Sequence, residues 1–491
     1  MLKSWDIFDT LITRKCVNPL SVFAIIEINY KIKNFATLRF KAEQNLLIRN
    51  LNYNFDDIYK EFSRITEIPK DFCDYIKNLE IKVELEQCIP ITENLRQVKA
   101  GDILISDMYL PEKVIRKMLD KAGLFAPVEI IITSGGKASG RIWKEFADQG
   151  QFLFHIGDNV EIDVQKPRQY GFDSALTTLS YPNEFEKWLI QRDFAFGSYL
   201  REIRLRNPFT EEIKRTYWTL FTLNVGILII LVQLIDELQK KHGFEYLGFC
   251  GRDTYYLWLL YKKFKEDLGE EPITNDYLYY SRKLVYYSRR EIINYFHSKI
   301  GDRKALMVDL IGTGTNLHYL RKTTDINYSI LLCCHDTNKA YKDATDLPKK
   351  WAAISDPSNI NDSFSFINYN YNDLPFNDSI EPFNRATHNS PIRMNALHAD
   401  EKNIFEIILS ESNDSENLDV FETCLKEVLN SKITYCRFKG EEAVEHLKQL
   451  LAIFVKLAAP VVMKSRHFIN EQMDLMDFIP KIIKSFDKNS C

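Results

Sequence analysis

Four short apolar segments in the first 180 residues constrain the fold most, because each ends in a cluster of polar or small residues. Helical patterns separate them, and they are SWDIFDTLI (4–12), DILISD (102–107), VEIIITS (128–134) and FLFHIGDN (152–159). Short buried strands that alternate with helices are typical of a parallel sheet with crossover helices. Reactive groups in such sheets gather where the strands end. The sequence therefore predicts an α/β domain with a Rossmann-like parallel sheet and its chemistry at these four ends.

The chain of 491 residues is long enough for two or three domains. The first is predicted at residues 1–14 and 98–182. Between these parts, residues 15–97 are rich in Lys, Glu, Leu and Ile with little glycine, which predicts a helical subdomain. A second α/β domain is predicted at 183–491, with a helical C-terminal part from Gly440. Within it, residues 355–379 are dense in Asn, Asp and Ser and predict a long surface loop.

Charge and cysteine content exclude several classes of protein. The formal net charge is −4 without a long basic run, so we expect no nucleic-acid partner. The nine cysteines form no CxxC pair, and their odd, scattered set is typical of reduced intracellular thiols. The N-terminus has no signal-peptide pattern. These features together predict a cytoplasmic protein.

One apolar stretch, Tyr217 to Leu238, is nearly long enough to cross a membrane. Polar side chains interrupt it, at Thr219, Thr222, Asn224 and Gln233. Such interruptions favour a buried core helix over a membrane span.

The polar residues at the four segment ends are the types that phosphoryl transfer requires. They are Asp6, Asp9 and Thr10, then Ser106 and Asp107, then Lys137, and last Asp158 and Asp163. A carboxylate that attacks a phosphoryl group needs a divalent cation to neutralise charge, so acidic residues from separate strands should converge. A hydroxyl and a lysine must also hold the transferring oxygens. The set predicts a Mg²⁺-dependent site for a phosphorylated small molecule.

This order of motifs resembles the haloacid dehalogenase (HAD) superfamily over residues 1–182, with residues 15–97 in the place of that family's helical cap. The resemblance implies a role for each residue. Asp6 is the nucleophile, Thr10 supports its loop, Ser106 with Asp107 binds phosphate, Lys137 stabilises nucleophile and phosphate, and Asp6, Asp158, Asp163 and the main-chain oxygen of Phe8 hold Mg²⁺.

One position departs from the phosphatases of that superfamily. Their residue two after the nucleophile is an aspartate that protonates the leaving oxygen and then activates water, whereas this chain has Phe8, which can do neither. Dehalogenases also lack that aspartate, but they do not need the metal carboxylates Asp158 and Asp163. Asp9 is an alternative acid/base only if the chain turns there, because adjacent residues on a strand point in opposite directions.

Two other assignments stay open. Ser106 is also a candidate N-cap for the helix that begins near LPEKVIRKML, because serine is favoured at that position. Lys144 is an alternative phosphate lysine, although its place in an amphipathic helix favours a solvated charge.

The second domain also has polar residues where its predicted strands end. They are Arg252 and Asp253, then Arg282, then Asp309 with Gly312, Thr313, Gly314 and Thr315. A strand, a glycine-rich turn and a helix together make an anion site, which predicts a phosphorylated ligand. In order, these segments loosely resemble the pyrophosphate and ribose-phosphate loops of phosphoribosyltransferases.

The whole chain resembles predicted bacterial HAD-type hydrolases of two-part build, often met beside glycosyltransferases in surface-polysaccharide gene sets. An FDIFDTL-like start, an SDMYLP segment, an RDG-like strand end and a segment near IEPFNRATHNS carry this resemblance. Glu381 and His388 lie in the last segment and join the candidate substrate-binding residues.

Three hypotheses follow. The first is a Mg²⁺-dependent hydrolase of a phosphate ester, a phosphosugar or a nucleotide, that forms an aspartyl-phosphate on Asp6. The second is a transferase whose second domain binds the phosphorylated donor, with the HAD unit accessory. The third is an inactive scaffold marked by Phe8. The sequence leaves the oligomeric state open.

Overall fold

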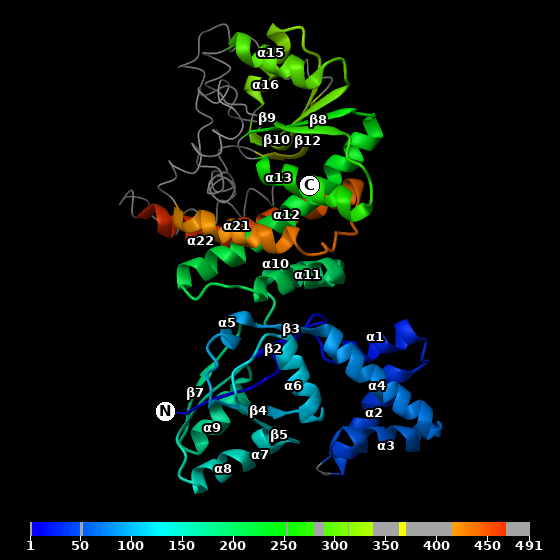
Figure 1. Cartoon of the computed structure of the whole chain (residues 1–491), viewed down its shortest axis with the longest axis vertical. Helices are drawn as coiled ribbons and strands as arrows, with labels where there is room; N and C mark the ends of the chain where they lie inside the picture. Colours follow the sequence, from blue (N-terminus) through cyan, green and yellow to red (C-terminus); the bar gives the residue numbers. More distant parts are fainter. Residues whose placement is uncertain are drawn as a thin grey trace. The chain divides into compact units, whose positions relative to one another are not determined.

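The computed structural model describes residues 2–49, 53–251, 254–278, 289–312, 314–336, 363–369 and 415–467. The chain divides into two compact units, of which the first is Met1–Ile190 with Gly197–Thr210 and the second is Gln191–Phe196 with Glu211–Cys491. Each unit has a five-stranded parallel sheet and helices that pack against it (Figure 1). The predicted α/β fold class with parallel sheets is confirmed.

The first sheet contains all four apolar segments that the sequence marks as strands. Its order is β5-β4-β1-β6-β7, and every neighbouring pair is parallel. The strands are β1 (Leu2–Trp5), β4 (Ile103–Asp107), β5 (Glu129–Thr133), β6 (Leu153–Gly157) and β7 (Asp173–Leu176).

Alternate side chains of these strands enter two separate cores, as the pleat of a strand requires. On β4, Leu104 joins the core with the helices of the insert, whereas Ile103 and Ile105 pack with Trp143 on the opposite face. Helices therefore cover both faces of the sheet. The helices from the end of the insert to residue 205 are α5 (Thr92–Leu95), α6 (Glu112–Lys121), α7 (Gly136–Ser139), α8 (Arg141–Asp148), the π-helix η1 (Val160–Gln165), α9 (Lys166–Gln169), α10 (Glu184–Arg192) and α11 (Phe194–Leu205).

The order of the strands determines where a ligand can approach. From β1 the chain passes to β4 and β5 on one side, and it then returns to β6 and β7 on the other side of β1. The connections that leave β1 and β6 therefore run in opposite directions. Ligands of open parallel sheets bind at the carboxyl ends of two such strands. Asp6 directly follows β1, and Asp158 directly follows β6.

Residues 15–97 are mainly helical, as predicted. An antiparallel pair, β2 (Ile12–Arg14) with β3 (Cys88–Pro90), closes the base of the insert. Between these strands lie α1 (Ser21–Tyr30), α2 (Phe35–Ile48), α3 (Phe55–Thr66) and α4 (Lys70–Gln87). Asn54 and Asp57 form a capping box that begins α3. Figure 1 shows the four helices grouped to one side of the first sheet.

The second sheet has the order β12-β11-β10-β8-β9, again all parallel. Its strands are β8 (Tyr246–Cys250), β9 (Thr274–Leu278), β10 (Ala305–Gly312), β11 (Ser329–Asp336) and β12 (Ser363–Tyr369). The described helices of this unit are α12 (Glu212–His242), α13 (Tyr255–Leu268), α15 (Arg289–Ile300), α16 (Thr315–Thr323), α21 (Ser415–Leu429) and α22 (Gly440–His467).

One prediction for this unit is wrong. Residues 355–379 were expected to form a surface loop, but 363–369 are the edge strand β12. Asn and Asp have low strand propensity, and their density in the sequence around 363–369 made the whole segment resemble a loop, although the strand itself reads SFSFINY. Parallel pairing with β11, from Ser363 beside Ile330 to Tyr369 beside Asp336, satisfies its backbone hydrogen-bonding groups on that side.

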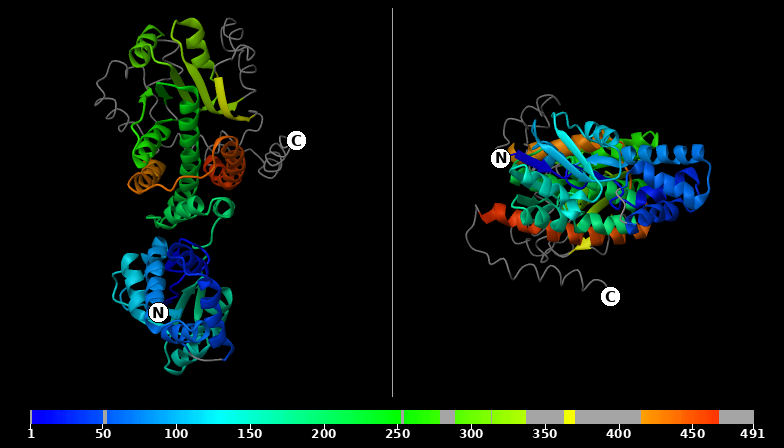
Figure 2. Two further views of the ribbon diagram at one scale, coloured as in Figure 1. Left: turned by 90° about the vertical axis from the view of Figure 1, so that its right-hand side faces the viewer. Right: turned by 90° about the horizontal axis from the view of Figure 1, so that it is seen from below.

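The long helix α12 contains the apolar stretch that the sequence places in a core. It is the single helix among the described residues that is long and apolar enough to cross a membrane, and 89% of its most apolar window is buried. It packs against α13, α21 and α22. Figure 2 shows α21 and α22 on either side of it. This burial agrees with the prediction of a core helix.

Candidate metal centre

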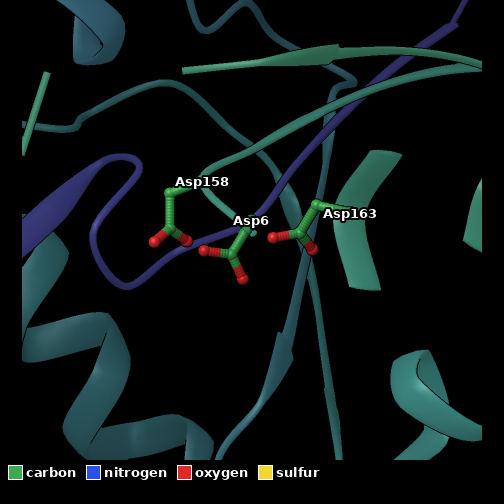
Figure 3. Close-up of side chains that lie close together, drawn as sticks. All are labelled: Asp6, Asp158 and Asp163. Carbon is green, nitrogen blue, oxygen red and sulfur yellow. The ribbon is translucent and has the colours of Figure 1, made fainter. Parts of the chain in front are cut away.

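Three carboxylates meet at the carboxyl edge of the first sheet. Asp6 follows β1, Asp158 follows β6 and Asp163 lies on η1, and one oxygen of each is within 4.8 Å of the others. Figure 3 shows Asp6 between the other two side chains. Oxygen ligands of this kind suit a hard divalent cation. The predicted convergence of carboxylates from separate strands is therefore present, and the set is chemically fit to hold Mg²⁺.

Hydrogen bonds and close packing hold these residues in place. The Asp6 N–H donates to the carbonyl oxygen of Ile156 at 2.8 Å, which ties the end of β1 to β6. The Asn159 side chain caps η1, and the main-chain N–H of Asn159 donates to Asp163 Oδ2 at 3.0 Å. Only glycine fits at position 157, since a Cβ there would lie 2.4 Å from the Cβ of Asp163. The segment GDNVEID thus folds so that it presents Asp163 to the centre.

Lys137 neutralises part of this charge. Its Nζ lies 2.6 Å from Asp6 Oδ1, 2.5 Å from Asp163 Oδ1 and 3.4 Å from the carbonyl oxygen of Ile105. Burial would lower the pKa of Lys137, but the two carboxylates outweigh it and raise the pKa above its ordinary value. The alternative lysine, Lys144, is exposed on α8, so the ammonium at the centre is that of Lys137.

Asp107 holds the loop that presents Lys137. Its carboxylate accepts hydrogen bonds from the N–H groups of Lys137, at 3.0 Å, and Ala138, at 3.1 Å, and from the Thr133 hydroxyl. These hydrogen bonds of the Asp107 carboxylate are thus with the end of β5 and the start of α7. The structure gives this residue a positioning role, whereas phosphate binding by Asp107 stays a prediction.

Burial and mutual repulsion raise the pKa values of two of the three carboxyls, whereas contacts with His155 and Lys137 lower that of the third. Burial raises the pKa of Asp6 to about 7, where Lys137 opposes and the charge of Asp163 adds to the effect. Burial and the charges of Asp6, Asp9 and Asp163 raise the pKa of Asp158 to about 8. Burial acts in the same direction on Asp163, but the His155 and Lys137 contacts outweigh it and lower its pKa. A cation would relieve the repulsion at Asp6 and Asp158.

His155 is a residue of the site that the sequence analysis missed. It lies fully buried on β6, with Nδ1 2.9 Å from Ser4 Oγ and Nε2 3.3 Å from Asp163 Oδ1. Burial lowers its pKa to about 4, so the ring is neutral at pH 7. The sequence signal that could have identified His155 is its place inside an apolar strand segment, two residues before GDN.

Asp9 lies in a turn rather than on a strand. Its φ is +59°, in the left-handed region, and its Oδ1 accepts a hydrogen bond from Thr13 Oγ1 at 2.5 Å. Thr13 Oγ1 in turn accepts one from Arg201 at 3.1 Å. The chain therefore does turn at Asp9, as its acid/base assignment required, and the charge of Asp9 acts on Asp158.

The Phe8 side chain packs against Arg14, and a phenylalanine cannot act as an acid/base at this position. The Arg14 guanidinium lies 4.6 Å from the centre of the Phe8 ring. Arg14 pairs with Glu84 of α4 through two hydrogen bonds, of 2.7 and 2.9 Å, and both side chains are buried. Phe8 thus joins the loop after β1 to the insert. Its main-chain oxygen stays a predicted metal ligand.

The two hydroxyl groups predicted at the site are those of Ser106 and Thr10. Ser106 is buried near the end of β4, and it does not cap α6, which begins at Glu112 after Pro111. The Thr10 hydroxyl is buried beside Asp6 and lowers the pKa of that carboxyl. In the described part of the chain, it lacks a partner with full hydrogen-bond geometry. Both hydroxyls remain candidates to bind an anion.

The second unit contains part of the other predicted site. β10 ends at Gly312, and Gly314, with φ +65°, precedes the helix α16 that begins at Thr315. Asp309 lies on β10, where its charge adds to burial in raising the pKa of Cys250 on β8. The predicted strand and the predicted helix are thus present. The other predicted site residues lie outside the described residues, namely Arg252, Asp253, Arg282, Thr313, Glu381 and His388.

No protein-family model matches this chain, and no curated protein matches it.

Proposed function

We propose that the first unit is a Mg²⁺-dependent phosphohydrolase of HAD type, in which Asp6 attacks the phosphorus of a phosphorylated sugar or nucleotide. The observation that supports this most is the meeting of Asp6, Asp158 and Asp163, of which Asp6 and Asp163 contact the ammonium of Lys137. That meeting lies where the connections of a parallel sheet diverge, which is where ligands of such sheets bind.

Each residue has a role that its surroundings support. Asp158 and Asp163, with one oxygen of Asp6, would hold the cation, which when bound supplies positive charge to the transferring phosphoryl oxygens. Lys137 orients the other groups by its contacts with Asp6 and Asp163. Ser106 and Thr10 would donate hydroxyl protons to the phosphoryl oxygens. Preorganised charges and donors of this kind lower the barrier of phosphoryl transfer.

The insert, residues 15–97, would act as the cap that selects the substrate and excludes water. The buried Arg14–Glu84 pair supports this proposal because it joins α4 to Arg14 of β2, which packs against Phe8 in the loop after Asp6. A cytoplasmic location belongs to the same proposal, and it is supported by the free thiols among the described cysteines.

The test is phosphate release from a panel of phosphosugars and nucleotides with and without Mg²⁺. Asp6→Asn should abolish Mg²⁺-dependent release, because an amide cannot act as the nucleophile. Asp148→Asn, on the exposed end of α8, is the matched control and should keep full activity. If Asp6→Asn releases phosphate as fast as the natural chain, the proposal fails. If the natural chain binds Mg²⁺ but releases phosphate from no substrate, the inactive scaffold is favoured.

A second candidate function is binding of a phosphorylated donor by the second unit, with transfer from that donor. It is favoured by topology, since β8 and β10 are adjacent strands whose connections leave in opposite directions. The turn at Gly314 and the N-terminus of α16 follow β10 at this edge. Calorimetry with phosphoribosyl pyrophosphate and nucleotide sugars, on the natural chain and on Asp309→Ala, tests it. Absence of binding by any donor would count against it.

A further inference from the structure

Helix α11 carries two arginines whose hydrogen bonds reach loops that border the metal centre. From these contacts we infer that Arg201 and Arg204 are positioning residues of the centre, which hold the main chain at Asp158 and the turn after Asp6 in place for cation binding. The inference rests on the cation site of the proposed function. It adds two residues outside 1–182, the part of the chain that the HAD resemblance covers. Both arginines belong to the first unit.

The segment that follows β7 is held through three consecutive carbonyl oxygens. Arg204 donates to those of Leu179, at 2.9 Å, and Tyr181, at 3.1 Å. Arg201 donates to that of Ser180 from two nitrogens, at 2.7 and 2.9 Å. Hydrogen bonds from a charged donor are about twice as strong as those between neutral groups. These main-chain contacts therefore fix the segment.

Tyr181 connects this segment to Asp158. Its hydroxyl donates to the main-chain oxygen of Asp158 at 2.8 Å, although the side chain is 48% exposed. Burial and the charges of nearby carboxyls, those of Asp158, Asp9 and Asp163, raise the pKa of this tyrosine, which agrees with a hydroxyl close to the centre. Asp158 is the one partly exposed carboxyl of the three that form the centre. Tyr181 therefore restrains the main chain at the carboxylate that packing holds least.

Arg201 also reaches the turn after Asp6. It donates to the main-chain oxygen of Arg14 at 2.9 Å and to Thr13 Oγ1 at 3.1 Å. The Thr13 hydroxyl in turn donates to Asp9 Oδ1 at 2.5 Å. Asp9 has a φ of +59°, and a residue other than glycine keeps such a conformation only where its surroundings hold it. One arginine thus supports both the turn after β1 and the segment after β7.

The two arginines are themselves held in place. Arg201 is 1% exposed, and Arg204 pairs with the fully buried Glu186 through two hydrogen bonds, of 2.6 and 3.0 Å. Burial lowers the pKa of Arg201 to about 10, so its guanidinium is still charged at pH 7. Side chains that packing and hydrogen bonds fix in this way can position other groups.

Cation binding depends on such restraint. Ligand oxygens must lie about 2.0–2.6 Å from a Mg²⁺ or Ca²⁺ ion, so the carboxylates must keep a fixed spacing. The charges of Asp6 and Asp158 oppose this spacing, because each disfavours the other. Residues that orient metal ligands without touching the metal typically contribute about 10- to 100-fold to affinity. Loss of the contact between Tyr181 and Asp158 should therefore weaken cation binding.

The experiment measures Mn²⁺ binding by calorimetry and the melting temperature without metal, on the full chain. Tyr181→Phe removes the hydroxyl and keeps the ring. Its Mn²⁺ dissociation constant should rise about tenfold, while its melting temperature stays that of the natural chain. Tyr75→Phe is the matched control, because Tyr75 is 49% exposed but lies on α4. A merely structural role would lower the melting temperature and leave the dissociation constant unchanged.

The arginines are tested by Arg201→Lys and Arg204→Lys, which keep the charge but lose the planar fork of donors. Each should weaken Mn²⁺ binding by a similar factor. Arg204→Lys combined with Tyr181→Phe should weaken it no further than the larger single effect, because both act through one contact. Arg206→Lys is the control, since Arg206 is 40% exposed and pairs with Glu202 one turn before it.

The outcomes separate this inference from the proposed function. If Tyr181→Phe binds Mn²⁺ as tightly as the natural chain, the inference is overturned and the phosphohydrolase stands. Additive effects of Arg204→Lys and Tyr181→Phe would overturn the role of Arg204.

Two further results concern the proposed function. If the natural chain binds no Mn²⁺, the inference and the proposed function both fail. If Tyr181→Phe weakens Mn²⁺ binding but the natural chain releases phosphate from no phosphosugar or nucleotide, the positioning role stands and the proposed function fails. Tyr181→Phe changes an exposed side chain, so it decides the matter even if Arg201→Lys does not fold.

Discussion

The ammonium of Lys137 lies 2.6 Å from the Asp6 carboxylate, although 131 positions separate the two residues in the sequence. The same ammonium lies 2.5 Å from Asp163, and Lys137 is 2% exposed. One buried ammonium therefore contacts both a carboxylate that follows β1 and a carboxylate on η1. We expect the stability of the centre without a metal to depend on these contacts.

Replacement of Lys137 by methionine should destabilise the first unit. Loss of one partner of a buried ion pair costs about 3–5 kcal/mol, because the remaining charges are left unpaired. The loss should be smaller at pH 5.5 than at pH 8, since burial already raises the pKa of Asp6 to about 7 and the group can take a proton. Urea denaturation at both pH values measures this. Lys144→Met, on the exposed face of α8, should change the free energy of unfolding by less than about 0.5 kcal/mol.

Stability without metal should decrease as the pH rises from about 5.5 to 8.5. The pKa values of Asp6, about 7, and Asp158, about 8, lie above that of an unfolded aspartate, so the folded chain binds more protons in this range. The pKa of Asp163 is lowered instead. The stability that Asp163 contributes is therefore lost only at pH values below the pKa of an unfolded aspartate. We expect the melting temperature to fall by a few degrees. Calorimetry should show a smaller fall for Asp158→Asn and an unchanged one for Asp148→Asn.

Mg²⁺ should reverse that fall, because a ligand that binds only the folded state stabilises it. A melting temperature that stays constant from pH 5.5 to 8.5 without metal would contradict the raised pKa values at the centre.

His155 should matter for cation affinity more than for folding. Residues that orient metal ligands typically contribute 10- to 100-fold to metal affinity. His155→Phe removes the contact with Asp163 but keeps a ring beside Trp143, whose centre lies 4.7 Å from the histidine ring. We expect weaker Mn²⁺ binding of that order by calorimetry, with partial recovery in His155→Gln, which keeps a donor. If His155→Phe binds Mn²⁺ as tightly as the natural chain, then Asp163 does not need His155 to orient it.

The Arg14–Glu84 pair should hold the insert to the loop after β1. Glu84→Gln leaves Arg14 buried beside Phe8 without its charge partner and should cost about 3–5 kcal/mol. The double variant Arg14→Met, Glu84→Met should recover most of this loss, since an apolar pair needs no partner charge. Glu112→Gln breaks an exposed pair with Arg116 and should cost at most about 1 kcal/mol. If the double variant is as unstable as Glu84→Gln, packing rather than charge decides the loss.

Several elements were predictable because their signals are local. The apolar runs that became β1, β4, β5 and β6 are short and end in polar clusters, and burial on both faces explains their composition. The parallel arrangement then implied that their carboxyl ends share one edge, which is why Asp6, Asp158 and Asp163 could be grouped in advance. The segment 363–369, SFSFINY, was missed because the Asn- and Asp-rich sequence on both sides of it obscured a short strand that pairs with β11.

The sequence by itself determined the alternation of strands and helices, the residue types at the strand ends and the presence of a phenylalanine at position 8. Only the tertiary structure decided which polar groups are already paired. Arg201 reaches Thr13 across 188 positions, and Glu84 reaches Arg14 across 70. A hydrogen bond or ion pair depends on distance and burial in space, which no spacing along the chain records. That is why the aspartate pair of WDIFDTL could be located from sequence, whereas the acceptor role of Asp9 and the packed state of Phe8 required the fold.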